Sequence, residues 1–189
     1  MKKCLILLLC TAMLTGAAWA QTTHLAYLQG YPDGTLRAER TVTREEFAQI
    51  VMRLTDYEPQ ADAFFDVPPT RWSYRAVCAV TQMGIMEAER GYFNPTEPIA
   101  ADELSRVLFA LWGAELDAEF RQITRGELAH LLNEILHRQP RCAEDLMDGM
   151  VLFCDNADAS AQYFVDLQEA SCAHTYEQTS SGERWIGLG

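Results

Sequence analysis

The feature that most constrains this chain is a turn-and-helix pattern that occurs more than once. Residues 30–35 read GYPDGT, which places proline and glycine where a type I turn favours them. Thr43 and Glu46 then have the spacing of a capping box and predict a helix start. Apolar residues follow at helical spacing, at positions 47, 50, 51 and 54. Because one helix cannot bury this face alone, the pattern predicts similar neighbouring units.

Two further segments repeat parts of this pattern. From Phe64 to Leu111 the chain reads as a complete unit of turn, helix, loop and helix, and it contains the sequence FDVP at 65–68. A third copy begins at Ile123, where Thr124 and Glu127 form a second predicted capping box. The repetition predicts a domain made of several short helical units.

On these residues the chain resembles the S-layer homology module of bacterial envelope proteins. Residues 21–63 and 123–189 match the second half of a unit, the latter followed by a C-terminal tail, whereas residues 64–122 match a whole unit. The tail of many such proteins has similar short motifs, here FCDN at 153–156, EA at 169–170, HTY at 174–176 and ERW at 183–185. The resemblance implies an all-α bundle of short helices with pseudo-threefold symmetry.

Five short helices are expected from the periodicity and the turn residues. They run from Arg44 to Leu54, Ser73 to Met83, Ala101 to Leu111, Arg125 to His137 and Ala159 to Ala170. Alternating residues around Ser180-Ser181-Gly182 predict a small C-terminal β-hairpin.

The third unit lacks its first half, because the chain between Gly113 and Gln122 has room only for a loop. The first unit likewise begins without an opening helix. One hypothesis is that the helix expected at Ala159 to Ala170 supplies a missing opening helix.

Residues 1–20 have the build of a secretory signal peptide. Lys2 and Lys3 precede an apolar run, and Ala18-Trp19-Ala20 offers a cleavage site. The run is too short for a permanent membrane span, which needs about 20 residues. Lipidation at Cys10 is the less favoured alternative, because Leu9 stands where a small residue is usual.

The charge of the chain argues against nucleic acid as a partner. The formal net charge is -12, and it becomes about -14 without Lys2 and Lys3. A chain of this sign repels polyanions on average, so an anionic glycan would need a local arginine site. The expected location is the cell wall or cell surface after secretion, without a stable membrane span.

No catalytic, cofactor or metal site is expected. No triad or nucleophile motif stands out from the sequence. His130, Glu134 and His137 share a helical face, but a solvated polar face explains them better than a metal. Among the cysteines, Cys78 fits a small buried hydrophobe, and one disulfide could join two of three others, namely Cys142, Cys154 and Cys172.

Arg44 and Arg125 are the main candidates for a binding role. Each follows a capping threonine, Thr43 or Thr124, in the first helical turn, where the helix dipole disfavours a cation by typically 0.3–1 kcal/mol. A bound anion would offset this cost. The resemblance implies that such arginines hold pyruvylated secondary cell-wall polysaccharide.

The alternative for these arginines is pairing with a nearby acid such as Glu45 or Glu127. The middle unit reads IAADE at 99–103 and has neither the threonine nor the arginine, so one groove is expected to be inactive.

Four further residues match the glycan-binding pattern of the family. Gly30 and Asp33 belong to the GYPDGT turn, and Asp66 and Trp72 to the DVPxxxW signature. The alternative for Trp72 is packing half in the core, and Asp66 is better explained as a loop cap.

These features predict an exported, noncatalytic envelope protein that associates with anionic cell-wall glycan. The competing prediction keeps the fold but treats the grooves as decayed, which leaves a structural or protein-interaction module.

Overall fold

The computed structural model describes residues 22–116 and 122–189. Within them, five α-helices, one 3-10 turn and three strands follow one another along the chain. Their order is β1 (Thr22–His24), α1 (Arg44–Thr55), α2 (Tyr74–Gln82), α3 (Ala101–Trp112), α4 (Arg125–Ile135), η1 (Ala143–Asp145), α5 (Phe164–Ser171), β2 (His174–Thr179) and β3 (Gly182–Leu188). The expected signal peptide, with Cys10, lies outside the described residues.

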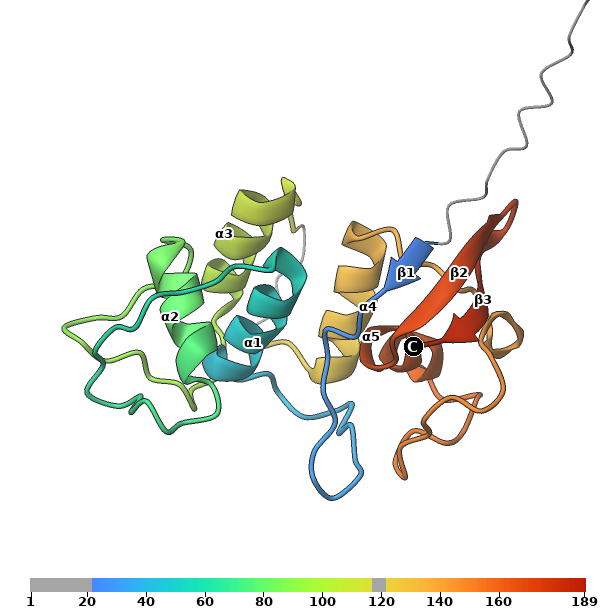
Figure 1. Ribbon diagram of the computed structural model, residues 1–189, viewed down its shortest axis with the longest axis horizontal. Coiled ribbons are helices and arrows are strands. Elements are labelled where there is room, and N and C mark those ends of the chain that lie inside the picture. The colour runs from blue at the N-terminus through green and yellow to red at the C-terminus, as the bar shows by residue number, and fades with distance from the viewer. Residues whose placement is uncertain (1–21, 117–121) are drawn as a thin grey trace, which may run out of the picture.

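The helices form two neighbouring groups. Helices α1, α2 and α3 lie at one end of the molecule, whereas α4, α5 and the sheet lie at the other (Figure 1). Helix α1 packs against α2, and α4 packs against α5. One hydrophobic core runs through both groups, since Val51 of α1, Leu132 of α4 and Leu167 of α5 belong to the same buried cluster.

Both predicted capping boxes are present. The Glu46 N–H donates to Thr43 Oγ1, and the Thr43 N–H donates to Glu46 Oε2 over 3.0 Å. Thr124 and Glu127 make the same reciprocal pair at the start of α4. Helix α3 begins after Ala100, which has no side-chain cap, as the sequence predicts.

The start of the last helix is a correction. We expect Ala159 from the sequence, but α5 begins at Phe164. The Asp158 carboxylate accepts hydrogen bonds from the N–H and hydroxyl of Ser160, and the Phe164 N–H donates to the Ala161 carbonyl. These local bonds hold residues 158–161 in turns, because a short acidic side chain competes with the helix for backbone groups.

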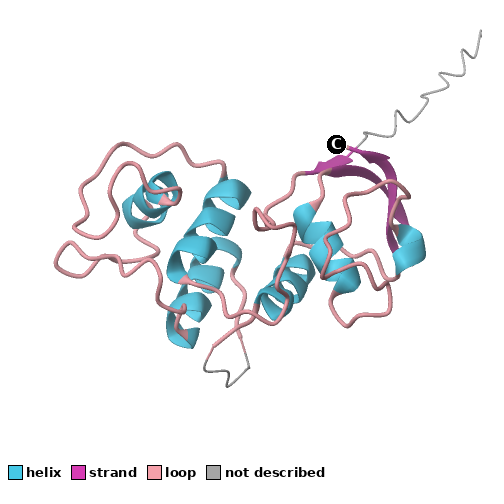
Figure 2. Ribbon diagram, turned by 90° about the horizontal axis from the view of Figure 1, so that it is seen from below, coloured by secondary structure: helices cyan, strands magenta, loops and turns pink. Residues whose placement is uncertain are grey.

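The C-terminal hairpin is confirmed, but it is part of a larger sheet. Strand β2 pairs with β3 and also with β1, antiparallel in both cases, in the order β1-β2-β3. Thr22 lies opposite Tyr176, and His24 lies opposite His174. The sheet runs along one side of the half that contains α5 (Figure 2). The expectation of an all-α fold with two strands is therefore corrected to a helical domain with a three-stranded sheet.

The C-terminal segment contacts the first turn in the way that the middle repeat contacts its own turn. Asp66 accepts hydrogen bonds from the N–H groups of Phe93 and Asn94 in the turn of the middle repeat. Asp155 accepts the matching pair from Leu36 and Arg37 in the first turn. Asp155 thus does for the first repeat what Asp66 does for the middle one, which supports the hypothesis that the C-terminal part replaces a missing opening half.

The starts of α1 and α4 are each joined to a neighbouring repeat by a backbone hydrogen bond of the same kind. The Arg44 N–H donates to the Glu97 carbonyl, and the Arg125 N–H donates to the Arg40 carbonyl. The third contact of a threefold arrangement would join the start of α3 to residue 121, which lies outside the described part. Pseudo-threefold symmetry therefore stays a prediction.

Candidate functional site

A cavity of about 570 Å³ opens between the first turn and helix α1. Its walls come from segments 27–32 and 40–53 and from three residues of other repeats, Trp72, Thr96 and Arg125. Four predicted site residues line it, namely Gly30, Thr43, Trp72 and Arg125. The cavity therefore joins parts of all three predicted repeats.

Tyr31 and Glu46 form the polar centre of this cavity. The Tyr31 hydroxyl donates to Glu46 Oε1 over 2.5 Å, and Arg40 donates to both groups. Burial alone would raise the pKa of Glu46, but the bonds from Tyr31 and Thr43 and the charges of Arg40 and Arg125 lower it below its ordinary value. Glu46 is therefore held as a carboxylate whose charge is already met by protein groups.

Arginines surround the Tyr31 ring. The guanidinium carbons of Arg37 and Arg125 lie 3.9 and 4.8 Å from the ring centroid, and that of Arg40 lies at 5.4 Å. Cations over an aromatic face are attracted by its electron density. The ring thus keeps several positive charges beside the cavity.

Arg53 carries the least compensated charge of the cavity. Its guanidinium donates to Gln29 Oε1 over 2.7 Å, and among the described residues no carboxylate lies within ion-pair distance of it. Burial lowers the pKa of Arg53, since the low-dielectric surroundings disfavour its charged form. An anion entering the cavity would supply the missing countercharge.

Trp72 lies at the rim with 59% of its surface exposed. Its neighbour Arg71 donates two hydrogen bonds of 2.7 Å to the buried Glu45 carboxylate at the start of α1, and the Ser73 hydroxyl donates to Glu45 over 2.5 Å. Trp72 belongs to neither buried cluster, so its ring is more exposed than packing half in the core predicts. Its backbone is anchored on both sides while its ring stays available to solvent.

Arg125 belongs to the cavity wall but is almost fully buried, with 3% of its side chain exposed. It donates to the carbonyls of Leu36 and Gln29 over 2.7 Å each, and its Nη1 lies 3.7 Å from Glu46 Oε1. Burial lowers the pKa of Arg125. The guanidinium therefore clamps the first turn onto α4.

Arg44 makes the equivalent contacts in the middle repeat and does not line the cavity. It donates to the carbonyls of Phe93 and Glu87 and pairs with Glu103. Arg44 is therefore paired with Glu103, the third residue of α3, and Arg125 lies beside Glu46, the third residue of α1. These acids differ from Glu45 and Glu127, which the sequence offers as alternative partners.

The remaining predicted residues stabilise turns or helix starts. Gly30 has no room for a side chain, because an added Cβ would lie 2.2 Å from the Phe153 ring. Asp33 accepts from Thr35 and Arg37, and these hydrogen bonds lower its pKa to about 2. The loop-cap interpretation of Asp66 is confirmed by its bonds to the middle turn, and Thr124 caps α4.

The sequence did not predict several of the residues that line the cavity, among them Tyr31, Arg40, Glu46 and Arg53. Arg53 reads as an ordinary residue on the solvated face of α1. Arg53 follows Gln49 by four residues, so the two side chains lie on the same side of α1, and both line the cavity.

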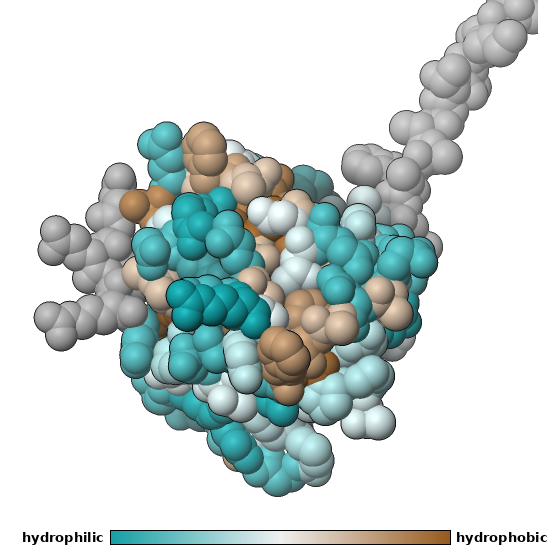
Figure 3. Space-filling model, turned by 90° about the vertical axis from the view of Figure 1, so that its left-hand side faces the viewer, coloured by the Kyte–Doolittle hydropathy of each residue, from teal (hydrophilic) through white to brown (hydrophobic). Residues whose placement is uncertain are grey.

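Away from the cavity, the face formed by α2 and its loops carries small hydrophobic groups scattered among hydrophilic residues (Figure 3).

His130 lies within ion-pair distance of Asp166 and Glu134 on an exposed helix face, in line with a solvated polar role. The four cysteines of the described residues are free, with Cys78 buried as expected.

The fold and the cavity together define a module of helical repeats with a groove between a turn and a helix start, in which charged groups lie beside apolar surface. Residues 23–48 and 63–99 match the family model of the S-layer homology domain, so the chain is similar to this domain over those two segments. This domain is a noncatalytic module that anchors envelope proteins to cell-wall glycans.

The chain is also similar to Cell surface glycoprotein 1 of Acetivibrio thermocellus, with 36% identity over 91 residues. The match covers 45% of this chain but only 4% of the much longer relative. Both findings point to the cell surface or cell wall. None of the helices in the described ranges has the length and apolarity needed to cross a membrane.

Proposed function

We propose that this protein associates with an anionic, pyruvylated secondary cell-wall polysaccharide through the cavity between the first turn and α1. The observation that carries the proposal is the Arg53 guanidinium, which faces the cavity with an amide oxygen as its hydrogen-bond partner. A carboxylate accepts two parallel hydrogen bonds from such a group.

The other walls of the cavity suit a sugar. The exposed Trp72 ring offers a flat surface on which the apolar face of a sugar can pack. Arg40, with 39% of its side chain exposed, adds a second cation at the opening. Glu45 and Glu46 do not oppose the anion strongly, because each is already paired with an arginine and a hydroxyl group.

In this proposal the arginines at the helix starts take different parts. Arg125 contributes positive potential from the cavity wall and holds the turn that carries Gly30 and Tyr31. Arg44 and Thr124 act through the fold, since neither lines the cavity. The mechanism thus rests on Arg53 and Trp72, with Arg125 and Thr43 positioning the groove.

Binding of the purified polysaccharide would test this function. Arg53→Gln should weaken binding by about 10-fold or more, since a charged hydrogen bond contributes roughly 1.5–3 kcal/mol. Trp72→Ala should weaken binding as well, because the sugar would lose the aromatic surface on which its apolar face packs. Arg75→Ala is the matched control, because Arg75 is exposed, pairs with Glu58 and lies outside the cavity. Binding that is unchanged in both cavity variants, or that survives removal of the pyruvyl groups, would refute the site.

The alternative function is a scaffold with decayed grooves. The observation in its favour is that Arg44 and Arg125 are both used between repeats, where they donate to backbone carbonyls. A folded protein that binds neither purified polysaccharide nor intact cell walls would support this alternative.

A further inference from the structure

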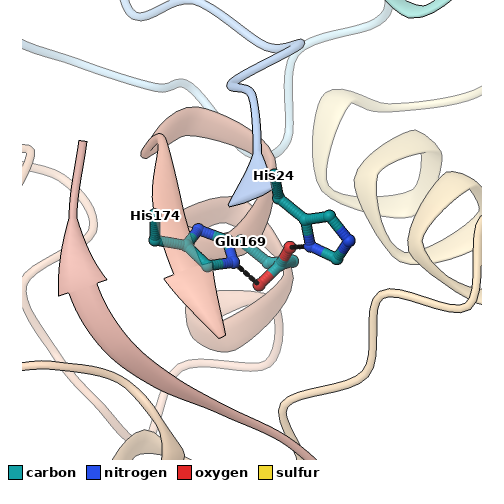
Figure 4. Close-up of side chains that lie close together, drawn as sticks. All are labelled: His24, Glu169 and His174. Carbon is teal, nitrogen blue, oxygen red and sulfur yellow. Dashed lines mark hydrogen bonds and ion pairs between the residues drawn. The ribbon is translucent and has the colours of Figure 1, made fainter. Parts of the chain in front are cut away.

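A second cluster of polar side chains lies at the other end of the molecule, where strand β1 meets α5 and β2. His24 Nδ1 lies 2.9 Å from Glu169 Oε1, and His174 Nε2 lies 3.2 Å from Glu169 Oε2 (Figure 4). The three ligand atoms all lie within 4.8 Å of one another. None of these residues lines the proposed glycan cavity.

The cluster is shielded from water. The side chains of Glu169 and His174 are fully buried, and that of His24 is 13% exposed. Polar groups placed so deeply are costly unless each finds a partner of the opposite kind. Each buried nitrogen and oxygen of this cluster therefore needs a partner.

His174 leaves one ring nitrogen without a suitable partner. Its Nδ1 lies 2.9 Å from the Cys172 carbonyl oxygen, which can only accept, so Nδ1 carries a proton. In the neutral ring Nε2 then presents a lone pair to Glu169 Oε2, another acceptor. Among the described residues no hydrogen bond satisfies Nε2, although the carboxylate lies within ion-pair distance. Two acceptors that face each other need a positive species between them, which is either a second proton on the His174 ring or a metal ion.

The charges around the cluster indicate how much positive charge is needed. Glu183 is a second buried carboxylate, with its Oε2 3.8 Å from His24 Nδ1. The described cations within ion-pair distance of these two acids are the histidines alone. A divalent ion would balance both carboxylates while the two imidazoles stay neutral.

We propose that His24, Glu169 and His174 bind a divalent transition-metal ion, with Zn²⁺ as the best fit. Two imidazole nitrogens and a carboxylate form a ligand set that Zn²⁺ prefers. Tetrahedral Zn²⁺ with bonds of about 2.0–2.1 Å separates its ligand atoms by roughly 3.3 Å. The two histidine-to-carboxylate separations, 2.9 and 3.2 Å, lie close to this value and reach different Glu169 oxygens. The ligand atoms of the set span up to 4.8 Å, so metal binding would draw the two imidazoles closer together.

The surrounding bonds orient the ligands as a metal site requires. Histidine ligands commonly donate their other N–H to a carbonyl, as His174 does to Cys172. The Trp185 indole N–H donates to Glu169 Oε2 over 2.8 Å. The Trp185 ring stacks on the His174 ring, with the two ring centroids 3.9 Å apart. The ion would link the N-terminal strand β1 to α5 and β2 and would thus fasten the two ends of the described chain together.

Titration of metal-free protein with Zn²⁺ by calorimetry tests this site, and one equivalent should bind. Loss of an outer-shell partner usually weakens metal binding by roughly 10–100-fold, so His24→Gln and His174→Gln should weaken it by at least that much. His130→Gln is the matched control, because His130 also lies 3.0 Å from an acid but is exposed.

Absorption of the Co²⁺-loaded, unsubstituted protein provides a test that does not depend on the folding of any variant. Tetrahedral coordination of Co²⁺ should give intense absorption bands in the visible range. These bands should disappear when Zn²⁺ is added and displaces Co²⁺. Absence of binding and of these bands in the unsubstituted protein would overturn the proposal. Binding that is lost in His130→Gln, or retained in folded His24→Gln and His174→Gln, would also overturn it.

Discussion

The first and middle turns are held by the same two kinds of contact, but from different distances along the chain. The middle turn is capped by Asp66 of its own repeat and clamped by Arg44. The first turn is capped by Asp155, 119 residues away from Leu36, and clamped by Arg125. If the predicted repeats are correct, the first repeat is divided between two distant segments of the chain, and the same closing contacts are preserved.

The two clamps also differ in burial. The side chain of Arg125 is 3% exposed, whereas that of Arg44 is 15% exposed. The turn beside Arg125 contributes Gly30, Tyr31 and Pro32 to the cavity wall, whereas the turn beside Arg44 contributes Thr96. The first turn thus supplies the larger share of the proposed glycan site.

Removing the buried clamp should have the largest effect on stability. Arg125→Ala leaves the Leu36 and Gln29 carbonyls without their donor, and breaking a buried ionic contact costs about 3–5 kcal/mol. Arg44→Ala should cost less, about 1–3 kcal/mol, because water can reach its partners more easily. Urea denaturation measures both values. Equal losses would show that burial does not distinguish the two clamps.

Removing the two caps should produce similar energies in different places. Asp66→Ala and Asp155→Ala each leave two backbone N–H groups unpaired, which costs about 1–3 kcal/mol. Hydrogen exchange should then rise at Phe93 and Asn94 in the first variant and at Leu36 and Arg37 in the second.

Asp33→Ala is the control for the caps, because Asp33 bonds only within its own exposed turn in the described structure. It should change stability by about 0.5 kcal/mol or less. If Asp155→Ala is as mild as this control, the C-terminal segment does not close the first repeat.

The acid at the centre of the first repeat predicts a pH dependence. The pKa of Glu46 is below its ordinary value, so the folded protein binds fewer protons there than the unfolded chain. Its stabilising contribution is present above the ordinary glutamate pKa and is lost as pH falls through that value towards the folded one. Glu46→Gln should therefore cost about 1–2 kcal/mol at pH 7 and less at pH 3. Denaturation at both pH values measures this, and a constant difference would contradict it.

The local parts of this fold could be predicted from sequence. The starts of α1 and α4 follow from Thr43 and Thr124 with their matching glutamates, because a capping box acts within four residues. The start of α5 was misplaced since the Asp158 turn competes with the helix. Strand β1 was missed because its partner β2 is about 150 residues away along the chain.

The candidate site was only partly predictable for the same reason. Trp72 and Arg125 could be selected from motifs, and both line the cavity. The bonds from Arg44 and Arg125 to carbonyls of another repeat depend on how the units pack, which spacing within one unit does not show. Their role in glycan binding stays a prediction. His24 and Glu169 meet across 145 residues, so no local pattern indicated the cluster.

The smallest expected effect concerns the one repeat helix that lacks its cap. Ala100 already has the extended backbone that a capping residue needs, with φ -75° and ψ 147°, close to Thr43 at -86° and 160°. Glu103 stands three residues later, so Ala100→Thr should complete a capping box and stabilise the protein by about 0.5–1 kcal/mol. Thr43→Ala should cost about 1 kcal/mol in the opposite direction. Thermal melts of both variants measure the pair. If Ala100→Thr does not stabilise the protein, the Glu103 carboxylate is held by its ion pair with Arg44 and cannot also accept the hydrogen bond of a capping box.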